Sequence, residues 1–335
     1  MTFNSAGCVR ADLHVHSWFS GQAGHLRFLK ARDCYSDPEQ VYRTARKRGM
    51  DVVTITDHDS IDGCLQVLER HPDADDFFIS EEIECAFPDV ELKVHVGAYD
   101  ITERIHKDIQ PLRGNVFEAT AYLRSEGIFY SLNHPFFFFK NQITFAEYVE
   151  RALRCFPAFE VRNGTMLASH NRLAEEIAWQ AIDSTGRPIV PIAGSDSHSL
   201  FGVGSTFTET PGKTREDFLT SLRAGVARPG GRDGGIWRGA KEIYAVVGNY
   251  WASLLGFGRQ DLSWQRRVIG LAFSGVSMPF QFSPLVVAAL HKRGEAARVE
   301  QYRREWIAAH TTGSRDCPPE TVAVGMNADV AETKS

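Results

Sequence analysis

Short apolar runs alternate with helical patterns along the first 210 residues of the chain. Such alternation is typical of parallel strands that are connected by helices. Seven strands of this kind suit a barrel better than a small open sheet. The predicted strands are Val9–Val15, Asp51–Thr56, Phe77–Glu82, Leu92–Ala98, Ile128–Leu132, Phe159–Val161 and Pro188–Ala193.

Two of the intervening helices have clear start signals. Asp37 precedes Pro38 and is predicted to cap a helix that ends at Gly49. Thr144 and Glu147 have the spacing of a capping box, in which each side chain bonds to the backbone of the other residue.

The pattern changes after the Gly- and Pro-rich stretch Arg228–Gly235, which is predicted to be a linker. The segment Val268–Leu290 carries no charge and has the length of a membrane span, but it contains two prolines and several polar residues. We therefore interpret it as buried helix and loop, with membrane contact as the lesser alternative. Three helices are predicted in this region: Trp237–Leu255, Trp264–Phe273 and Leu285–Ala309.

These patterns predict three parts of the chain. Residues 8–228 form the barrel, residues 236–310 form a helical extension, and the polar residues 311–335 form a disordered tail.

Composition places the protein among soluble globular proteins. Apolar residues make up 43%, charged residues 24%, and the net charge of −5 offers no general attraction for a polyanion. The six cysteines are scattered without a Cys-x-x-Cys pair, and residues 1–10 lack the features of a signal peptide. We therefore expect a cytoplasmic location and no stable insertion into a membrane.

Two histidines near the N-terminus, His14 and His16, are the first chemical signal. Residues two apart in a strand point to the same face, so both imidazoles can bind one metal ion. A single His-x-His pair is weak evidence by itself, because polar residues are common near strand ends.

Further histidines and acids recur at or near the predicted strands, and the carboxyl ends of parallel barrel strands meet at one mouth. Taken alone, a histidine such as His95 is more often a satisfied core residue than a ligand. Recurrence on six strands favours a shared metal site over coincidence. The additional candidate ligands are His58, Glu82, His95, His134, Asp196 and His198.

Imidazole and carboxylate ligands without thiolate suit zinc, manganese or iron. Several ligands per ion and a bridging carboxylate fit two or three divalent ions close together. Such ions activate water to hydroxide and clamp a substrate oxygen, so the predicted chemistry is hydrolysis.

The sequence resembles the PHP (polymerase and histidinol phosphatase) superfamily across about residues 10–210. This resemblance implies a distorted (β/α)7 barrel of PHP type, here with a C-terminal helical extension, a centre of two or three metal ions, and phosphoesterase activity. The matching motifs, in order, are DLHVHS (Asp12–Ser17), TITDHDSIDG (Thr54–Gly63), EEIEC (Glu81–Cys85), KVHVGAY (Lys93–Tyr99), NHPF (Asn133–Phe136), EVRNG (Glu160–Gly164) and GSDSH (Gly194–His198).

The resemblance also implies which residues bind each ion. His14, His16, Glu82 and Asp196 would bind the first ion. Glu82 would bridge to a second ion at His95 and His134, and a third would lie at His58 and His198. Glu84, two residues after Glu82 on the same face, is the alternative bridging ligand.

One departure from the family pattern concerns the third ion. Many relatives have an aspartate shortly after the second histidine, and the run from His16 to Gly21 lacks it. His25 is a candidate replacement, and a two-metal enzyme is the other interpretation.

The leading hypothesis is a metal-dependent phosphoesterase that hydrolyses a phosphomonoester or a small nucleotide by metal-activated hydroxide. Asp196 or Asp57 would orient the water or accept protons. Arg162 would bind a phosphate oxygen, with a surface salt bridge as its equal alternative.

Two other functions remain open. The first is an exonuclease on short RNA or DNA, with bases stacking on Phe136–Phe139, although packing of these rings at the barrel rim or against the C-terminal helices is the favoured interpretation. The second is a non-catalytic metal-binding module that docks a partner. Hydrolysis of a C–N bond is a further chemical alternative at the same kind of centre.

Overall fold

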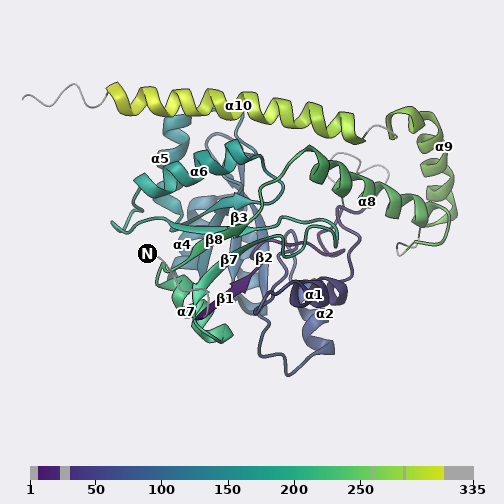
Figure 1. The fold of residues 1–335 in the computed structure, drawn as a ribbon, viewed down its shortest axis with the longest axis horizontal. Helices are drawn as coiled ribbons and strands as arrows, with labels where there is room; N and C mark the ends of the chain where they lie inside the picture. The colour runs from purple at the N-terminus through teal and green to yellow at the C-terminus, as the bar shows by residue number, and fades with distance from the viewer. Residues whose placement is uncertain (1–6, 23–30, 259, 261, 282–283, 313–335) are drawn as a thin grey trace, which may run out of the picture.

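Two β-sheets form the centre of the computed structural model, which describes residues 7–22, 31–258, 260, 262–281 and 284–312 (Figure 1). The larger sheet has the order β2 (Ser80–Phe87), β3 (Leu92–Tyr99), β4 (Phe129–Asn133), β5 (Ala158–Asn163) and β6 (Val190–Gly194). The smaller sheet has the order β1 (Cys8–Ala11), β7 (Thr206–Pro211) and β8 (Arg228–Gly231). Helices surround both sheets, so the predicted α/β class is confirmed.

The prediction of purely parallel strands is wrong for half of the larger sheet. β2 pairs with β3, and β3 with β4, in antiparallel orientation, and only β4, β5 and β6 are parallel neighbours. The cause is the short connection between β2 and β3, residues 88–91. A turn of this length joins antiparallel strands, whereas a parallel pair needs a long crossover.

A closed seven-stranded barrel is not seen among the described residues. The predicted strand Asp51–Thr56 is not a regular strand, and β1 ends before His14. Isolated bridges continue the pairing instead, from Ser197 to Val15 and from Glu82 to His58. A backbone hydrogen bond from Thr56 to Val15 (2.8 Å) lies between these bridges. The two outer edges of the larger sheet are therefore connected at the end where the histidines lie.

Among the described residues, seven α-helices and a 3-10 helix, η3 (Gln110–Leu112), precede the C-terminal segment, and two of the α-helices start at the caps predicted above. Asp37 accepts a hydrogen bond from the Glu39 backbone (3.0 Å), and Thr144 accepts one from the Glu147 backbone (3.2 Å), as predicted for caps. Only this half of the capping box predicted at Thr144 forms, because the Glu147 side chain pairs with Arg151. These helices are α1 (Pro38–Lys47), α2 (Asp62–Arg70), α3 (Glu103–Ile109), α4 (Val116–Ser125), α5 (Phe145–Cys155), α6 (Ala168–Gln180) and α7 (Arg215–Arg223).

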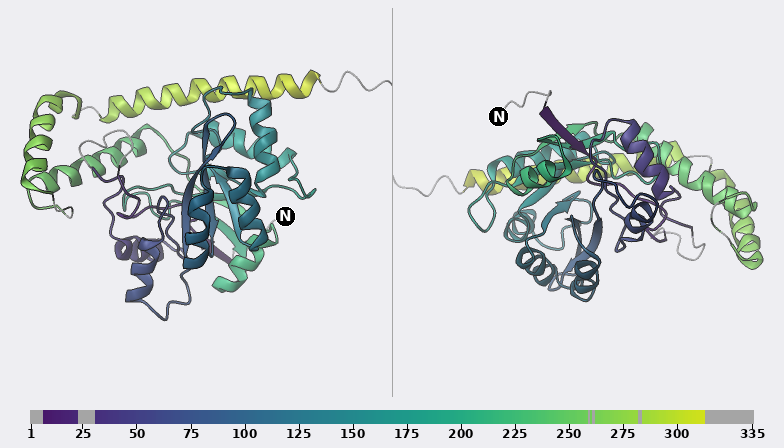
Figure 2. Two further views of the ribbon diagram at one scale, coloured as in Figure 1. Left: turned by 180° about the vertical axis from the view of Figure 1, so that it is seen from behind. Right: turned by 90° about the horizontal axis from the view of Figure 1, so that it is seen from below.

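The C-terminal segment consists of α8 (Ile236–Leu254), α9 (Trp264–Gln281) and α10 (Pro284–Thr312). α10 runs alongside α5 and α6, whereas α9 lies at the far end of the molecule (Figures 1 and 2). Tyr302 anchors α10, since its ring stacks on Phe145 with centroids 5.0 Å apart and its hydroxyl donates to Phe139 O (2.7 Å).

Three boundary predictions for this segment need correction. The predicted linker Arg228–Gly235 contains β8, which pairs with β7. The second helix continues to Gln281, eight residues beyond the predicted end at Phe273. Thr311 and Thr312 belong to α10 rather than to a tail, and residues 313–335 lie outside the described part of the chain. None of the described helices has the length and apolarity to cross a membrane.

Candidate metal centre

All eight predicted metal ligands lie together at one end of the larger sheet. They come from β2 and β3, from the segments that follow β1, β4 and β6, and from the segment between α1 and α2, which carries His58. Four triads each offer one ligand atom per residue, with these atoms within 4.8 Å of one another. The triads are His14–Glu82–His134, His14–His16–Asp196, His58–Glu82–His95 and His16–His58–His198.

Glu82 occupies the middle of this group and is completely buried. Its Oε1 lies 3.0 Å from His14 Nε2 and 3.1 Å from both His95 Nδ1 and His134 Nε2. Its Oε2 lies 3.0 Å from His58 Nδ1. One carboxylate therefore connects histidines from four separate segments, as a bridging ligand would.

Glu84, the alternative bridging ligand, points elsewhere. Its Oε1 accepts a hydrogen bond from Lys93 (2.7 Å), and its Oε2 remains 3.9 Å from His95 Nε2. Its side chain is 37% exposed, in contrast to the buried Glu82. Glu82, rather than Glu84, is thus the glutamate that the fold places among the histidines.

Asp196 faces the two histidines of the His-x-His pair. Its Oδ1 lies 3.5 Å from His14 Nε2 and 3.4 Å from His16 Nε2. Its Oδ2 accepts hydrogen bonds from Asn163 Nδ2 (3.1 Å) and Thr165 Oγ1 (2.9 Å). These two donors fix the carboxylate and leave Oδ1 directed at the imidazoles.

Two of the candidate ligands have unusual backbone conformations. The φ angle is +27° at His134 and +49° at Asp196, in the left-handed region that non-glycine residues rarely adopt. Such conformations cost about 1–3 kcal/mol each and concentrate at functional sites. The fold therefore accepts strain in order to direct these two side chains.

Outer partners fix the orientation of the His-x-His imidazoles. His14 Nδ1 donates to Glu160 Oε1 (2.9 Å), and His16 Nδ1 donates to Ser20 Oγ (2.9 Å). Ser20 in turn donates to Asp57 Oδ1 (2.7 Å). A hydrogen bond at Nδ1 directs the Nε2 lone pair toward the centre, which is the usual arrangement for metal-binding histidines.

The ligand atoms at the centre are left without hydrogen bonds, although they are buried. Buried polar atoms normally find partners, so a cluster of such atoms requires an explanation. A divalent cation would supply the missing interaction, because imidazole nitrogens and carboxylate oxygens bind zinc, manganese and iron. The residues present therefore fit a metal centre. The unpartnered atoms that face the centre are His14 Nε2, His16 Nε2, His95 Nδ1 and Glu82 Oε2, whereas His134 Nε2 is hydrogen-bonded to Glu82.

The ionisable side chains at the centre shift one another's pKa values. Burial opposes ionisation of Glu82, but nearby His14 and His95 outweigh this effect and hold the pKa of Glu82 well below its usual range. Burial also opposes protonation of His14, but Glu82, Glu160 and Asp196 outweigh it and raise the pKa of His14 well above its usual value. Protons and metal ions would therefore compete for the same nitrogens.

Asp33 is a candidate ligand that the sequence analysis missed. Its Oδ2 lies 3.4 Å from His58 Nε2 and 3.2 Å from His198 Nε2. It follows His16 by 17 residues, so no local motif marked it. His25, the replacement suggested from the sequence, lies outside the described residues.

The three predicted catalytic residues, Asp196, Asp57 and Arg162, differ in their position relative to the centre. Asp196 lies in the centre, whereas Asp57 is held behind it by Ser17, whose backbone N–H and hydroxyl both donate to Asp57 at 2.6 Å. The nearest carboxylate to Arg162 is Asp233, with 3.7 Å between Nε and Oδ1. This position favours the salt-bridge alternative for Arg162, and its contact with phosphate stays a prediction.

The C-terminal helices contact the loops that carry the centre. From α8, Glu242 Oε1 lies 2.9 Å from Ser197 Oγ, and Arg238 donates to Ser195 O (2.9 Å). From α10, Lys292 donates to Thr165 O (2.5 Å). Residues 236–310 therefore adjoin Asp196 from two sides, which no sequence pattern indicated.

Comparisons with known proteins place part of the chain in a family. Residues 168–227 match the PHP_C family, described as PHP-associated. A segment of 58 residues is 42% identical to the protein MJ1587 of Methanocaldococcus jannaschii. This segment covers 17% of the present chain and only 33% of that relative.

Several solved structures are similar at low sequence identity. PsfC from Pseudomonas syringae has 16% identity and a TM-score of 0.47, with coverage of 73% of this chain and 99% of that one. An amidohydrolase from Chromobacterium violaceum has 15% identity and a TM-score of 0.46, with coverage of 65% and 97%. A two-domain Bacteroides vulgatus protein that contains a predicted PHP-like metal-dependent phosphoesterase has 15% identity and a TM-score of 0.44, with coverage of 67% and 65%.

The PHP_C match begins at α6 and ends just before β8. It includes the GSDSH motif, which supplies Asp196 and His198 to the centre. Residues 168–227 therefore match a PHP-associated family, which agrees with the resemblance inferred from the sequence.

Proposed function

We propose that this protein is a metal-dependent phosphoesterase that hydrolyses phosphomonoesters. The observation that carries the proposal is the buried group of histidines around Glu82, whose ligand atoms lack hydrogen-bond partners. In the overall reaction, a water oxygen forms a bond to phosphorus and the bond from phosphorus to the alcohol oxygen breaks. The alcohol leaves with a proton, and inorganic phosphate remains.

The proposed ligand assignment is the one that the resemblance implies, with Asp33 added. His14, His16, Glu82 and Asp196 would hold one cation, and Glu82 would also contribute to a second cation at His95 and His134. His58 and His198 would hold a third together with Asp33, whose Oδ2 lies within 3.4 Å of both imidazoles. Divalent ions at these positions would activate water and neutralise the charge that develops on phosphate.

The remaining residues position these ligands. Glu160 orients His14 through Nδ1 and also accepts the His134 backbone N–H (2.8 Å), so one carboxylate fixes two ligand segments. Asp57 acts through Ser20 on His16 and is assigned a positioning role rather than proton transfer. Asp196 Oδ1 is the carboxylate oxygen best placed to orient a water molecule.

Phosphate release from a panel of esters tests this function. The protein loaded with Mn²⁺ is expected to hydrolyse at least one phosphomonoester, and His14→Ala is expected to lower the rate by more than the roughly 10–100-fold effect of losing one outer partner. Hydrolysis that is equal in His14→Ala would reject the mechanism. Tightly bound metal without hydrolysis of any ester would instead support the binding module.

One observation favours a second candidate, an exonuclease on short nucleic acids. The ring of Phe138 lies 4.6 Å from His95, and the ring of Phe137 lies 5.4 Å from His134, between centroids. Both rings are half-buried, so a base could stack beside the centre. Phe136 and Phe139, in contrast, are buried in the core. Faster hydrolysis of short oligonucleotides than of mononucleotides would favour this candidate.

The assignment of Asp33 gives a separate prediction. Asp33→Asn is expected to weaken the third cation by about 10–100-fold or more while the other two stay bound, because only His58 and His198 would remain there. Elemental analysis after dialysis measures the metal content directly. Asp89→Asn, at an exposed carboxylate that pairs with Arg151 (2.6 Å), is the matched control. Equal metal content in both variants would contradict the role of Asp33.

A further inference from the structure

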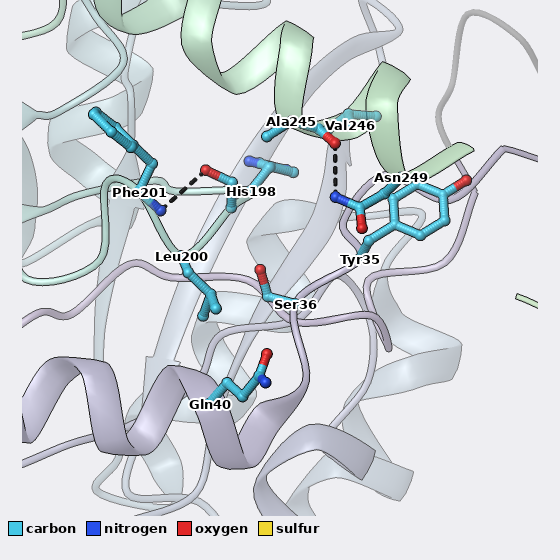
Figure 3. Close-up of a pocket in the computed structure, with 10 residues that line it drawn as sticks. Tyr35, Ser36, Gln40, His198, Leu200, Phe201, Ala245, Val246 and Asn249 are labelled. Carbon is cyan, nitrogen blue, oxygen red and sulfur yellow. Dashed lines mark hydrogen bonds between the residues drawn. The ribbon is translucent and has the colours of Figure 1, made fainter. Parts of the chain in front are cut away.

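A pocket of about 270 Å³ opens beside His198 (Figure 3). Three parts of the chain line it: the segment from Tyr35 to Gln40, the loop from His198 to Phe201, and α8. We name it the α8 pocket; its contacts from α8 are Ala245, Val246 and Asn249. Because His198 belongs both to the pocket and to a candidate metal triad, the α8 pocket adjoins the metal centre.

The wall that α8 provides is fixed relative to His198. Glu242, one turn before Val246, lies 2.9 Å from Ser197 Oγ, and Ser197 immediately precedes His198. Arg238, one further turn back, donates to Ser195 O (2.9 Å). These two contacts connect α8 to the loop that carries His198.

The polar groups in the α8 pocket are hydroxyls and carboxamides. Ser36, Gln40, Ser199 and Asn249 contribute them. Asn249 Nδ2 donates to Ala245 O (2.7 Å), which orients the side chain, and its carbonyl oxygen is turned away from the helix (Figure 3). Such groups both donate and accept hydrogen bonds, so they can recognise hydroxyl groups of a ligand.

No side chain that is always charged at neutral pH lines this pocket. Among its ten lining residues there is no Lys, Arg, Asp or Glu, and Leu200, Phe201 and Val246 give apolar surface. Lys241 contacts the Phe201 ring, with Nζ 4.3 Å from the centroid, but does not line the pocket. A second phosphate placed here would lose its hydration without gaining a cation, which is costly.

We propose that the α8 pocket binds the uncharged, hydroxyl-bearing alcohol part of a phosphomonoester whose phosphate lies on the metal centre. The inference rests on the proposed function and deepens it by naming the substrate class. The volume lies near the lower end of the ~300–1,000 Å³ usual for small-molecule sites, which suits a single sugar ring. The lack of Lys and Arg among the ten lining residues disfavours bisphosphates and oligonucleotides, because their additional phosphates would need cations in the pocket.

Two substitutions of the same kind at neighbouring positions test the pocket. Val246→Phe fills the α8 pocket, whereas Val247→Phe, on the same helix outside the lining, is the control. Each Mn²⁺-loaded protein is assayed with a hexose monophosphate, with AMP, with a hexose bisphosphate and with methyl phosphate, which has almost no alcohol part. Binding of the hexose monophosphate and of inorganic phosphate is measured in parallel by calorimetry.

Wild type is expected to prefer the hexose monophosphate over methyl phosphate in kcat/KM. Val246→Phe should reduce this preference about tenfold or more through KM, and Val247→Phe should retain it. Asn249→Ala should also reduce this preference. Because it removes atoms instead of adding them, agreement between the two variants shows that the loss does not come from a packing defect at Val246. Metal content measured in each variant confirms that the centre is intact.

The outcomes separate this inference from the proposed function. If Val246→Phe and Asn249→Ala both hydrolyse phosphate esters with an unchanged preference for the hexose monophosphate over methyl phosphate, the proposed role of the pocket is wrong. The proposed phosphoesterase activity is then unaffected. Preference for AMP or for the bisphosphate would also overturn it. Absence of turnover together with tighter binding of the hexose monophosphate than of inorganic phosphate, lost in Val246→Phe, would support the pocket and reject the activity.

Discussion

Replacing Glu82 with glutamine is expected to empty the metal centre and to lower hydrolysis by at least about 10³-fold. This exceeds the ~10–100-fold cost of losing one outer partner, because Glu82 contacts both histidines proposed for the second cation, His95 and His134, as well as His14. Glutamine preserves the shape but replaces one carboxylate oxygen by an amide nitrogen, which cannot bridge two cations. Elemental analysis and phosphate release measure the two effects.

Glu81→Gln is the matched control for that experiment. Glu81 is adjacent to Glu82 and equally buried, but it faces away from the centre and accepts a hydrogen bond from His106 (2.8 Å). Burial raises the pKa of Glu81, and the hydrogen bond with His106 opposes this effect. Equal metal content in Glu82→Gln and Glu81→Gln would show that Glu82 is not a bridging ligand.

The second large effect is expected at Gly194, the last residue of β6. A Cβ atom at this position would lie 2.2 Å from His14 Cβ and 2.6 Å from the His14 backbone nitrogen. Neither atom belongs to the flexible end of a side chain, so the segment that carries the His-x-His pair must shift. Gly194→Ala is expected to lower the free energy of unfolding by about 1–3 kcal/mol or more and to weaken metal binding.

Urea unfolding and metal titration measure these two consequences. Gly114→Ala is the control, because a Cβ at Gly114 meets no atom within 4 Å and its φ is not positive. That change should leave stability within about 1 kcal/mol of wild type. A Gly194→Ala protein as stable as Gly114→Ala, and with equal metal affinity, would contradict the close approach of β6 to His14.

The ligands could be predicted because they interrupt apolar patterns. His95 lies inside an apolar run, and Glu82 and Asp196 lie at or just after the ends of such runs. The expectation that all of them lie at the carboxyl ends of parallel strands is wrong for His95. His95 reaches the centre from the middle of β3, an antiparallel strand whose register pairs His95 with Asn133.

Residues that act through tertiary contacts could not be predicted in the same way. Asp33 lies in an irregular segment, and its carboxylate reaches His58 and His198 only because distant parts of the chain fold together. Glu160 is in a quoted motif, but its hydrogen bond to His14 spans 146 residues. The Gly and Pro residues in Arg228–Gly235 suggested a linker. Part of this segment instead pairs with the edge of β7 and forms β8.

Glu242 on α8 contacts Ser197, which is adjacent to the candidate ligand Asp196. Through this contact, the position of α8 and the binding of a cation at the centre can affect each other. If seating α8 stabilises the loop that carries Asp196, then a bound cation must favour the seated helix by the same free energy. Metal depletion would then loosen one wall of the α8 pocket, so that affinity for the organic part of a substrate would fall together with catalytic competence. With this coupling, the position of α8 would depend on the metal content of the centre, although α8 contributes none of the candidate ligands named above.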